Sequence, residues 1–326
     1  MPSPSDPARP FGSVLSAGAS EAAGGAEARS QPVGGDRRNG DGADDATMTP
    51  KQVIQHYLRT GEADPLFSAW PGDVMAAGKR GWNEMVDALV GAVRRRAAGR
   101  RVPWKLPDLD LPAFTRRKVG PMIRGLFRQR EQEAVFAVLE RSVVFLVPDT
   151  IEQTLRDQTC TRSAWDLANI YLGSLGAKPL SRPGARFVGL SEETTCYVSM
   201  EYFATRQRFA DFVVHEAAHV FHNCKRVTVG LPETRTKEWL LDIAFRKRET
   251  FAYTCEAYSR ILELGTTAAQ RRVLLEELAA GPMPCDETVA ADEYLDILRE
   301  AVAARNGWKR ILARCGPARR SRQGMP

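Results

Sequence analysis

The sequence predicts an α+β fold that is mainly helical, and two kinds of pattern support this prediction. Apolar residues recur at helical spacing through most of the chain after residue 48, as at Trp82, Met85 and Leu89. Two short stretches, ARFVGL and TTCYVSMEYF, are instead rich in β-branched and aromatic residues, and the turn-forming SEE separates them. The 326 residues have a hydrophobic fraction of 43%, which is enough for the core of one large domain or of two smaller ones.

The first part of the chain is expected to be a disordered tail followed by helices. Residues 1–47 are rich in Gly, Ala, Ser, Pro and charged residues, and they bury too little apolar surface to offset the entropy of ordering. Helical structure is expected to begin at TMTPKQVIQHYL, where Thr49 can cap a helix and Pro50 suits its first turn. Further helices are predicted near residues 71–99, 112–128 and 130–141, and we assign residues 48–142 to a helical N-terminal region.

This N-terminal region carries an excess of positive charge. Between Lys79 and Arg130 there are 14 Lys and Arg residues against 4 Asp and Glu residues. Such an excess is most often a solvated basic face. A surface for nucleic acid is the alternative, with little support, because aromatic side chains do not alternate with the basic ones as they do in single-strand binders.

Residues 143–315 are expected to form a second domain that combines strands and helices. VVFLVP at 143–148 is a predicted strand, and TTCYVSMEYF has the alternation of a half-buried strand. The predicted helices lie near residues 149–157, 161–174, 206–224, 236–263, 267–279 and 286–304, with Gly265 as a helix stop and residues 316–326 as a polar tail.

The segment VVHEAAHVFHN, residues 213–223, contains three of the four histidines of the chain. His215 and His219 are four residues apart, so on a helix both imidazoles lie on one face and can bind the same ion. Glu216 stands beside the first of them and can take a proton from a water that attacks a carbonyl carbon. The flanking residues are uncharged, which is typical of a buried metal-binding helix.

With this H-E-x-x-H motif the chain resembles the zincin metallopeptidases, and within them the gluzincin branch, over residues 185–262. The Gly and the third His of the metzincin branch are missing. The resemblance implies a zincin-like domain with a small sheet beside the H-E-x-x-H helix, and a Zn²⁺ ion held by His215, His219 and a glutamate of a following helix. It further implies hydrolysis of peptide bonds in a peptide or protein substrate, with a zinc-activated water and with Glu216 as the general base.

Three glutamates are candidates for the third metal ligand. Glu249 is preferred, because ETFAY is similar to the E-x-F-A pattern around the ligand glutamate of gluzincin aminopeptidases. Eighteen residues separate Glu238 from His219, a spacing that those aminopeptidases share, but the neighbourhood of Glu238 lacks the rest of the pattern. Glu256 lies two turns after Glu249 on the same helix face.

Other residues near the motif have expected roles in supporting the site. Tyr253 occupies the position where thermolysin-like members carry an aspartate that orients a ligand histidine, so Asp242 or Glu256 is expected to orient that histidine instead. Tyr253 itself is expected to act in catalysis by donating its hydroxyl to the developing oxyanion. His222 is expected either to support the metal site or the substrate, or to be an ordinary surface or core histidine. TTCYVSMEYF is expected to be an edge strand with which an extended peptide pairs.

The remaining patterns concern compartment and function class. No run of 18 or more apolar residues predicts a membrane span, and the N-terminus does not resemble a secretory signal. The six cysteines are far apart and form no C-x-x-C pair, which favours reduced thiols and the cytoplasm. The expected function is that of a cytoplasmic zinc metallopeptidase. The alternatives are a DNA- or partner-binding regulatory protein that uses a zincin-like domain as sensor or scaffold, and a zinc-stabilised structural protein without turnover.

Overall fold

The computed structural model of the chain describes residues 48–100, 107–180, 188–234 and 237–317. It is 61% helix and 6% strand, which confirms the prediction of a mainly helical α+β fold. The predicted disordered tail, most of the predicted polar tail and the beginning of ARFVGL lie outside the described residues. Within the described part of the chain, no helix combines the length and the apolar character that a membrane span requires.

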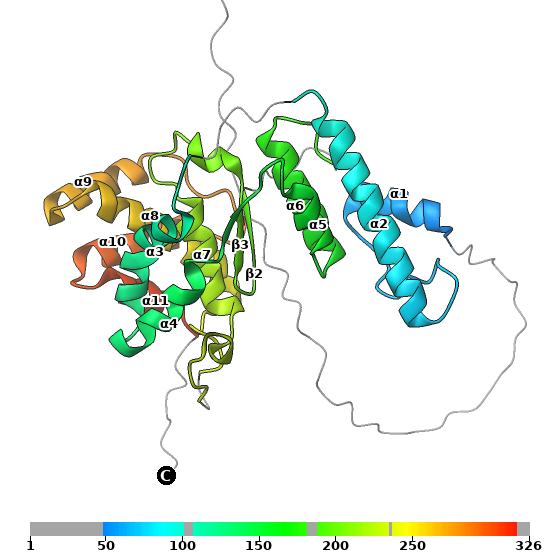
Figure 1. The fold of residues 1–326 in the computed structure, drawn as a ribbon. Helices are drawn as coiled ribbons and strands as arrows, with labels where there is room; N and C mark the ends of the chain where they lie inside the picture. The colour runs from blue at the N-terminus through cyan, green and yellow to red at the C-terminus, as the bar shows by residue number, and fades with distance from the viewer. Residues whose placement is uncertain (1–47, 101–106, 181–187, 235–236, 318–326) are drawn as a thin grey trace, which may run out of the picture.

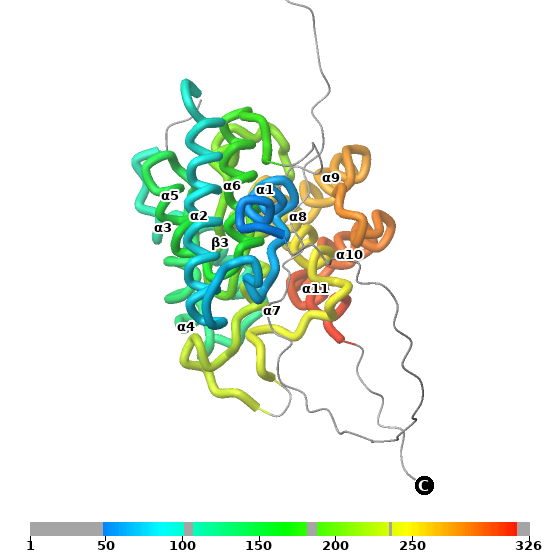
Figure 2. The backbone as a smooth tube through the Cα atoms, turned by 90° about the vertical axis from the view of Figure 1, so that its right-hand side faces the viewer, coloured from blue at the N-terminus to red at the C-terminus, as the bar shows by residue number. Residues whose placement is uncertain are grey.

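The helices form two groups, each packed around its own core (Figure 1). The first group contains α1 (Pro50–Thr60), α2 (Val74–Ala97), α5 (Ile151–Arg156) and α6 (Thr161–Ser174). The second group contains α3 (Leu111–Leu126), α4 (Gln129–Leu139), α7 (Phe212–Asn223), α8 (Arg248–Leu264), α9 (Ala268–Ala279), α10 (Ala291–Ala303) and α11 (Gly307–Cys315). Figure 2 views the molecule from the side of the first group, with α1 and α2 in front.

A three-stranded sheet separates the two cores. Its strands are β1 (Val143–Phe145), β2 (Gly189–Glu192) and β3 (Thr195–Val198), in the order β1-β3-β2. β3 runs parallel to β1 and antiparallel to β2, with Ser191 opposite Cys196. Side chains alternate across a strand, so Cys196 and Val198 enter the core of the second group, whereas Leu190 and Tyr197 pack against the first. The predicted alternation is thus confirmed for residues 195–198.

The prediction that TTCYVSMEYF forms an edge strand is wrong. β3 is the central strand of this sheet, and the strand ends at Val198, after which Met200–Phe203 form a 3-10 helix. The reason is the pairing of β3 with β1, which lies about fifty residues upstream in the sequence. The local pattern of β3 contains no information on that distant partner, which occupies the side that an extended peptide would need.

The packing of the helices does not follow their order in the sequence. α3 and α4 belong to the core that surrounds α7, although they precede residue 142. α5 and α6 follow residue 142, yet they pack with α1 and α2. The domain boundary between residues 142 and 143 remains a prediction. Helices from before this boundary pack in the second core, and helices from after it pack in the first core.

Several helix boundaries differ from those predicted. α1 begins as predicted, because Thr49 accepts a hydrogen bond from the backbone N–H of Gln52 and Pro50 is the first helical residue. α7 begins at Phe212 and not near 206, and α8 begins at Arg248 and not near 236. α11 was not predicted at all. Its signal is present in RNGWKRILARC, where the Asn306 side chain caps the helix by accepting from Lys309 N at 3.2 Å.

Candidate metal centre

Helix α7 carries the histidines in the middle of the second core. Asp211 caps the helix by accepting a hydrogen bond from Val214 N at 3.3 Å, and its other carboxylate oxygen lies 2.8 Å from Lys118 Nζ on α3. Every residue from Phe212 to His222 is buried, so α7 has no solvent face. A helix buried on all sides must give its polar side chains partners inside the protein.

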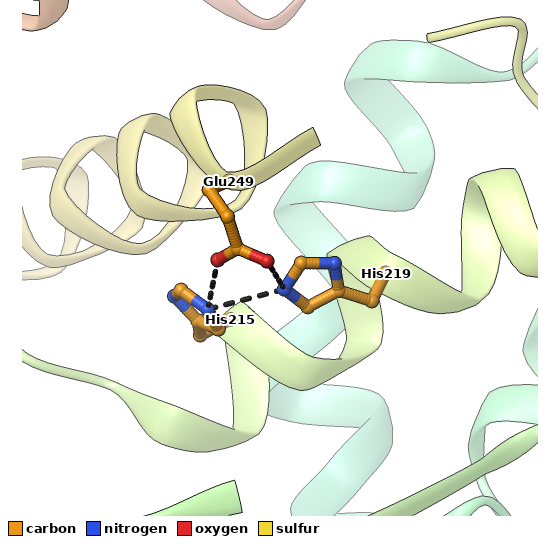
Figure 3. Close-up of side chains that lie close together, drawn as sticks. All are labelled: His215, His219 and Glu249. Atoms are coloured by element: carbon orange, nitrogen blue, oxygen red, sulfur yellow. Dashed lines mark hydrogen bonds and ion pairs between the residues drawn. The ribbon is translucent and has the colours of Figure 1, made fainter. Parts of the chain in front are cut away.

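The structure brings His215, His219 and Glu249 together (Figure 3). The two histidines come from α7, and Glu249 comes from the first turn of α8. His215 Nε2 lies 3.6 Å from one Glu249 oxygen, His219 Nε2 lies 3.5 Å from the other, and the two Nε2 atoms are 3.2 Å apart. All three side chains are buried, with relative exposures of 4% or less. The Nε2 atoms of two histidines and the carboxylate of Glu249 therefore converge in the protein interior.

The separations between these atoms fit a tetrahedral metal ion. Zinc binds nitrogen and oxygen ligands at about 2.0–2.1 Å, and the tetrahedral angle then places two ligands about 3.3–3.4 Å from each other. The observed separations of 3.2, 3.5 and 3.6 Å are close to that value, with each histidine nitrogen facing a different oxygen of Glu249. Two histidines and a glutamate are also the ligand set of several catalytic zinc sites, which leave the fourth position open. The donor set thus fits a divalent metal ion, with room for one further ligand.

The charges of the group are consistent with such a site. Burial raises the pKa of Glu249, but His219 and His215 more than offset this effect, so the pKa of Glu249 lies below its usual range. The carboxylate is therefore ionised at neutral pH and needs a positive charge beside it. A divalent cation among the three ligands would supply the positive charge that the two rings otherwise provide.

The other two candidate ligands lie elsewhere. Glu238 is half exposed, and its carboxylate pairs with Lys225 Nζ at 2.8 Å. It does not belong to the buried group of His215, His219 and Glu249. Glu256 lies behind His215, where its Oε2 is 3.1 Å from His215 Nδ1. The predicted orientation of a ligand histidine by Glu256 is therefore supported by geometry, and Glu256 takes this place in preference to Asp242. Its second oxygen accepts a hydrogen bond from Asp211 N at 2.7 Å, which fixes the carboxylate against the start of α7.

Glu216 faces the sheet, where two residues of β2 define its position. The Ser191 hydroxyl donates a hydrogen bond to Glu216 Oε2 at 2.6 Å. A Cβ atom on Gly189 would lie 2.3 Å from Glu216 Oε1, so only glycine leaves room for the carboxylate. Burial raises the pKa of Glu216, and the two ligand histidines and Ser191 counteract part of this rise. Neither β2 residue was predicted to belong to the site, although strand alternation places both of them on the same sheet face as Cys196.

Gly189→Ala is expected to lower any activity that depends on Glu216 by about 100-fold, because the new methyl group displaces the carboxylate by an ångström or more. Metal content should not change, since Gly189 does not contact His215, His219 or Glu249. Turnover and bound metal are measured on the same preparation. Gly78→Ala on α2 is the matched control, because its Cβ would have no neighbour closer than 3.9 Å. Wild-type turnover of Gly189→Ala would show that Glu216 needs no fixed position.

A cavity of about 450 Å³ opens beside His215 and Glu216. Its walls come from the segment before α7, from α8, from α9 with the residues that follow it, and from α10. Tyr253 and Glu256 line it from α8, and the Tyr253 ring packs edge-on against the His215 ring with the ring centres 4.5 Å apart. The remaining lining is largely apolar and includes Phe209, Phe212, Leu278, Met283 and Tyr294. A ligand in this cavity therefore meets a largely apolar surface, with polar groups at the metal centre and at the paired side chains of Arg208 and Glu277.

His222 is the third histidine of α7, and it is also buried. Its Nε2 lies 3.1 Å from His219 Nδ1, and its Nδ1 lies 3.1 Å from Asn223 Oδ1. It does not belong to the group of convergent ligand atoms. Burial lowers the pKa of His222, and the charges of His219 and Arg248 lower it further, which favours a neutral ring.

The chain was compared with protein-family models, with curated proteins and with solved structures, and none of them matches it. The interpretation of the site therefore rests on the residues of this chain and on their arrangement.

Proposed function

We propose that this chain is a zinc-dependent metallopeptidase with a zincin-like arrangement of its site. The observation that carries the proposal is the meeting of the buried side chains of His215, His219 and Glu249 within ligand distance of one another, next to a cavity that His215 and Glu216 line. This combination supplies the ligands, a base and a place for the substrate. A structural metal site needs neither the base nor the cavity, so the arrangement favours turnover.

In the proposed mechanism His215, His219 and Glu249 would hold the ion, with His215 and Glu216 at the wall of the cavity. Zinc bound there supplies Lewis acidity, which polarises the scissile carbonyl and makes water more acidic. Glu216 takes the proton from the attacking water and passes it to the leaving amine. The burial that raises the pKa of Glu216 suits this exchange, because a group that both accepts and donates a proton works best with a pKa near the working pH. Ser191 keeps the carboxylate in place.

Tyr253→Phe is expected to lower turnover by about 100-fold with metal content unchanged. The tyrosine lines the cavity beside His215, where its hydroxyl can donate a hydrogen bond to the oxyanion. Tyr294→Phe is the control, because Tyr294 lines the same cavity from α10 but has no ring contact with a ligand histidine among the described residues. Equal turnover of Tyr253→Phe and wild type would remove this role.

Metal removal tests the proposal as a whole. The full-length protein is purified, and its metal content is compared with its cleavage of a mixture of unstructured peptides. About one zinc per chain is expected, together with cleavage that a chelator abolishes and that one equivalent of zinc restores. A protein that takes up zinc but cleaves nothing would favour a structural or regulatory role, and one that takes up no metal would end the proposal.

No specific observation favours the regulatory alternative. The cations of the basic segment lie on both helix groups, and some of them are paired: Arg94 on α2 pairs with Glu152, and Arg116 on α3 with Glu133 and Glu140. Paired charges contribute less to the binding of nucleic acid than free ones. The cytoplasmic location is also part of the proposal, and the six free thiols are consistent with a reducing compartment.

A further inference from the structure

We propose that His222 and Asn223 are positioning residues that fix the ring of His219, so that its Nε2 is presented to the metal. The inference builds on the metal site of the proposed function. Its basis is a chain of two hydrogen bonds at the C-terminal end of α7 that links His219 to His222 and His222 to Asn223. Of the three residues that these hydrogen bonds link, only His219 belongs to the group of proposed metal ligands.

The positions of the donors and acceptors allow one arrangement of protons that is compatible with a bound metal. His219 presents its Nε2 lone pair to the ligand point, so its remaining proton is on Nδ1. That N–H faces His222 Nε2 at 3.1 Å, so His222 Nε2 must accept. Because that nitrogen carries no proton, the ring proton of His222 is on Nδ1, where it donates to Asn223 Oδ1 at 3.1 Å. Every polar atom of the three side chains along this path has a partner of the right kind.

Helix geometry explains why His222 supports the site and does not bind the metal. His215, His219 and His222 follow one another at intervals of four and three residues, so they share a face of α7. Glu249 approaches between the first two rings. His222 lies one turn further along the helix and meets the back of the His219 ring, so its Nε2 lone pair is directed at Nδ1–H and not at the ligand point.

The two ligand histidines therefore receive different support. His215 donates from Nδ1 to the carboxylate of Glu256, whereas His219 donates to an uncharged imidazole. Both partners fix the same tautomer, but only Glu256 adds negative charge. A buried carboxylate behind each ring would place two further charges next to Glu249 and Glu216, and the neutral chain through His222 avoids one of them.

Zinc affinity of two His222 variants tests the inference. His222→Phe keeps a ring of similar size but cannot accept from His219 Nδ1, and His222→Gln keeps an oxygen acceptor. Competition with a chromophoric chelator is expected to show that His222→Phe binds zinc about 10–100-fold more weakly than wild type, with His222→Gln within about threefold of it. Circular dichroism and thermal unfolding check that both variants fold. Wild-type affinity of a folded His222→Phe would overturn the inference.

A second measurement does not depend on any variant. The chain has only four histidines, so nitrogen-15 labelling of histidine gives a spectrum in which each ring can be assigned. In the zinc-loaded wild type, His222 is expected to be the neutral tautomer with the proton on Nδ1. A proton on His222 Nε2 would overturn the inference even if zinc binds. Failure of the wild type to take up zinc would overturn the proposed function together with this inference, so the two failures are distinguishable.

Discussion

Replacing Glu216 with glutamine is expected to lower peptide hydrolysis by about 1000-fold and to leave zinc binding intact. The amide has nearly the volume of the carboxylate, and its oxygen can still accept the hydrogen bond from Ser191. It cannot take a proton from water at neutral pH, and loss of a general base costs about two to four orders of magnitude in rate. Glu216 does not belong to the ligand group, so the metal should stay.

The measurement is kcat/KM on one defined peptide, with zinc content determined on the same sample. Glu238→Gln serves as the control, because that side chain is half exposed and pairs with Lys225 at the surface. A loss of both zinc and activity in Glu216→Gln would indicate a structural effect. Cleavage at the wild-type rate by zinc-loaded Glu216→Gln would exclude the proposed mechanism.

Glu249→Ala is expected to abolish stoichiometric zinc binding and, with it, all turnover. Loss of a residue that merely supports a ligand costs about 10–100-fold in metal affinity, and loss of a ligand should cost more. Glu249 is also the negative charge of the ligand group, so the variant leaves two neutral imidazoles to hold a divalent cation. Affinity for zinc is measured by chelator competition, and cleavage is assayed in parallel.

Two other glutamates provide a graded comparison for Glu249→Ala. Glu256→Gln should weaken zinc binding by about 10–100-fold, because the amide still contacts His215 Nδ1 but no longer carries charge. Glu238→Ala should bind zinc as the wild type does. Any other ranking of the three affinities would contradict the ligand set, and a tight zinc site in Glu249→Ala would exclude it.

The ligand group was predictable because its information is local. The spacing of His215 and His219 places both rings on one face of any helix that forms there. Glu249 could be preferred over Glu238 because of the residues around it, although Glu238 has the more familiar spacing. The structure supports that preference with a physical reason. Residues before Arg248 form a loop and a short 3-10 helix, so Glu238 never joins the helix that faces α7.

The residues that hold Glu216 in place were less predictable, because their contacts depend on the pairing of strands that are distant in the sequence. Ser191 and Gly189 contact Glu216 only because β2 pairs with β3 and lies across α7. β1 pairs with β3 from a position far upstream, which removed the expected edge strand. The cavity walls come from helices whose own amphipathic patterns do not specify which neighbour they face. Local sequence patterns predict the individual helices and strands. The contacts between distant helices and strands are known only once the core has been assembled.

The order of the chain has a consequence for how the protein becomes functional during synthesis. His215, His219 and Glu249 all precede the part of the cavity wall that α9, the residues after it and α10 provide, including Leu278 and Met283. A ribosome therefore synthesises the complete set of ligands before it has synthesised the whole cavity wall. A nascent or truncated chain that ends near Gly265 has the ligands without the full cavity, so the protein cannot cleave peptides in its proposed manner until its last helices have folded.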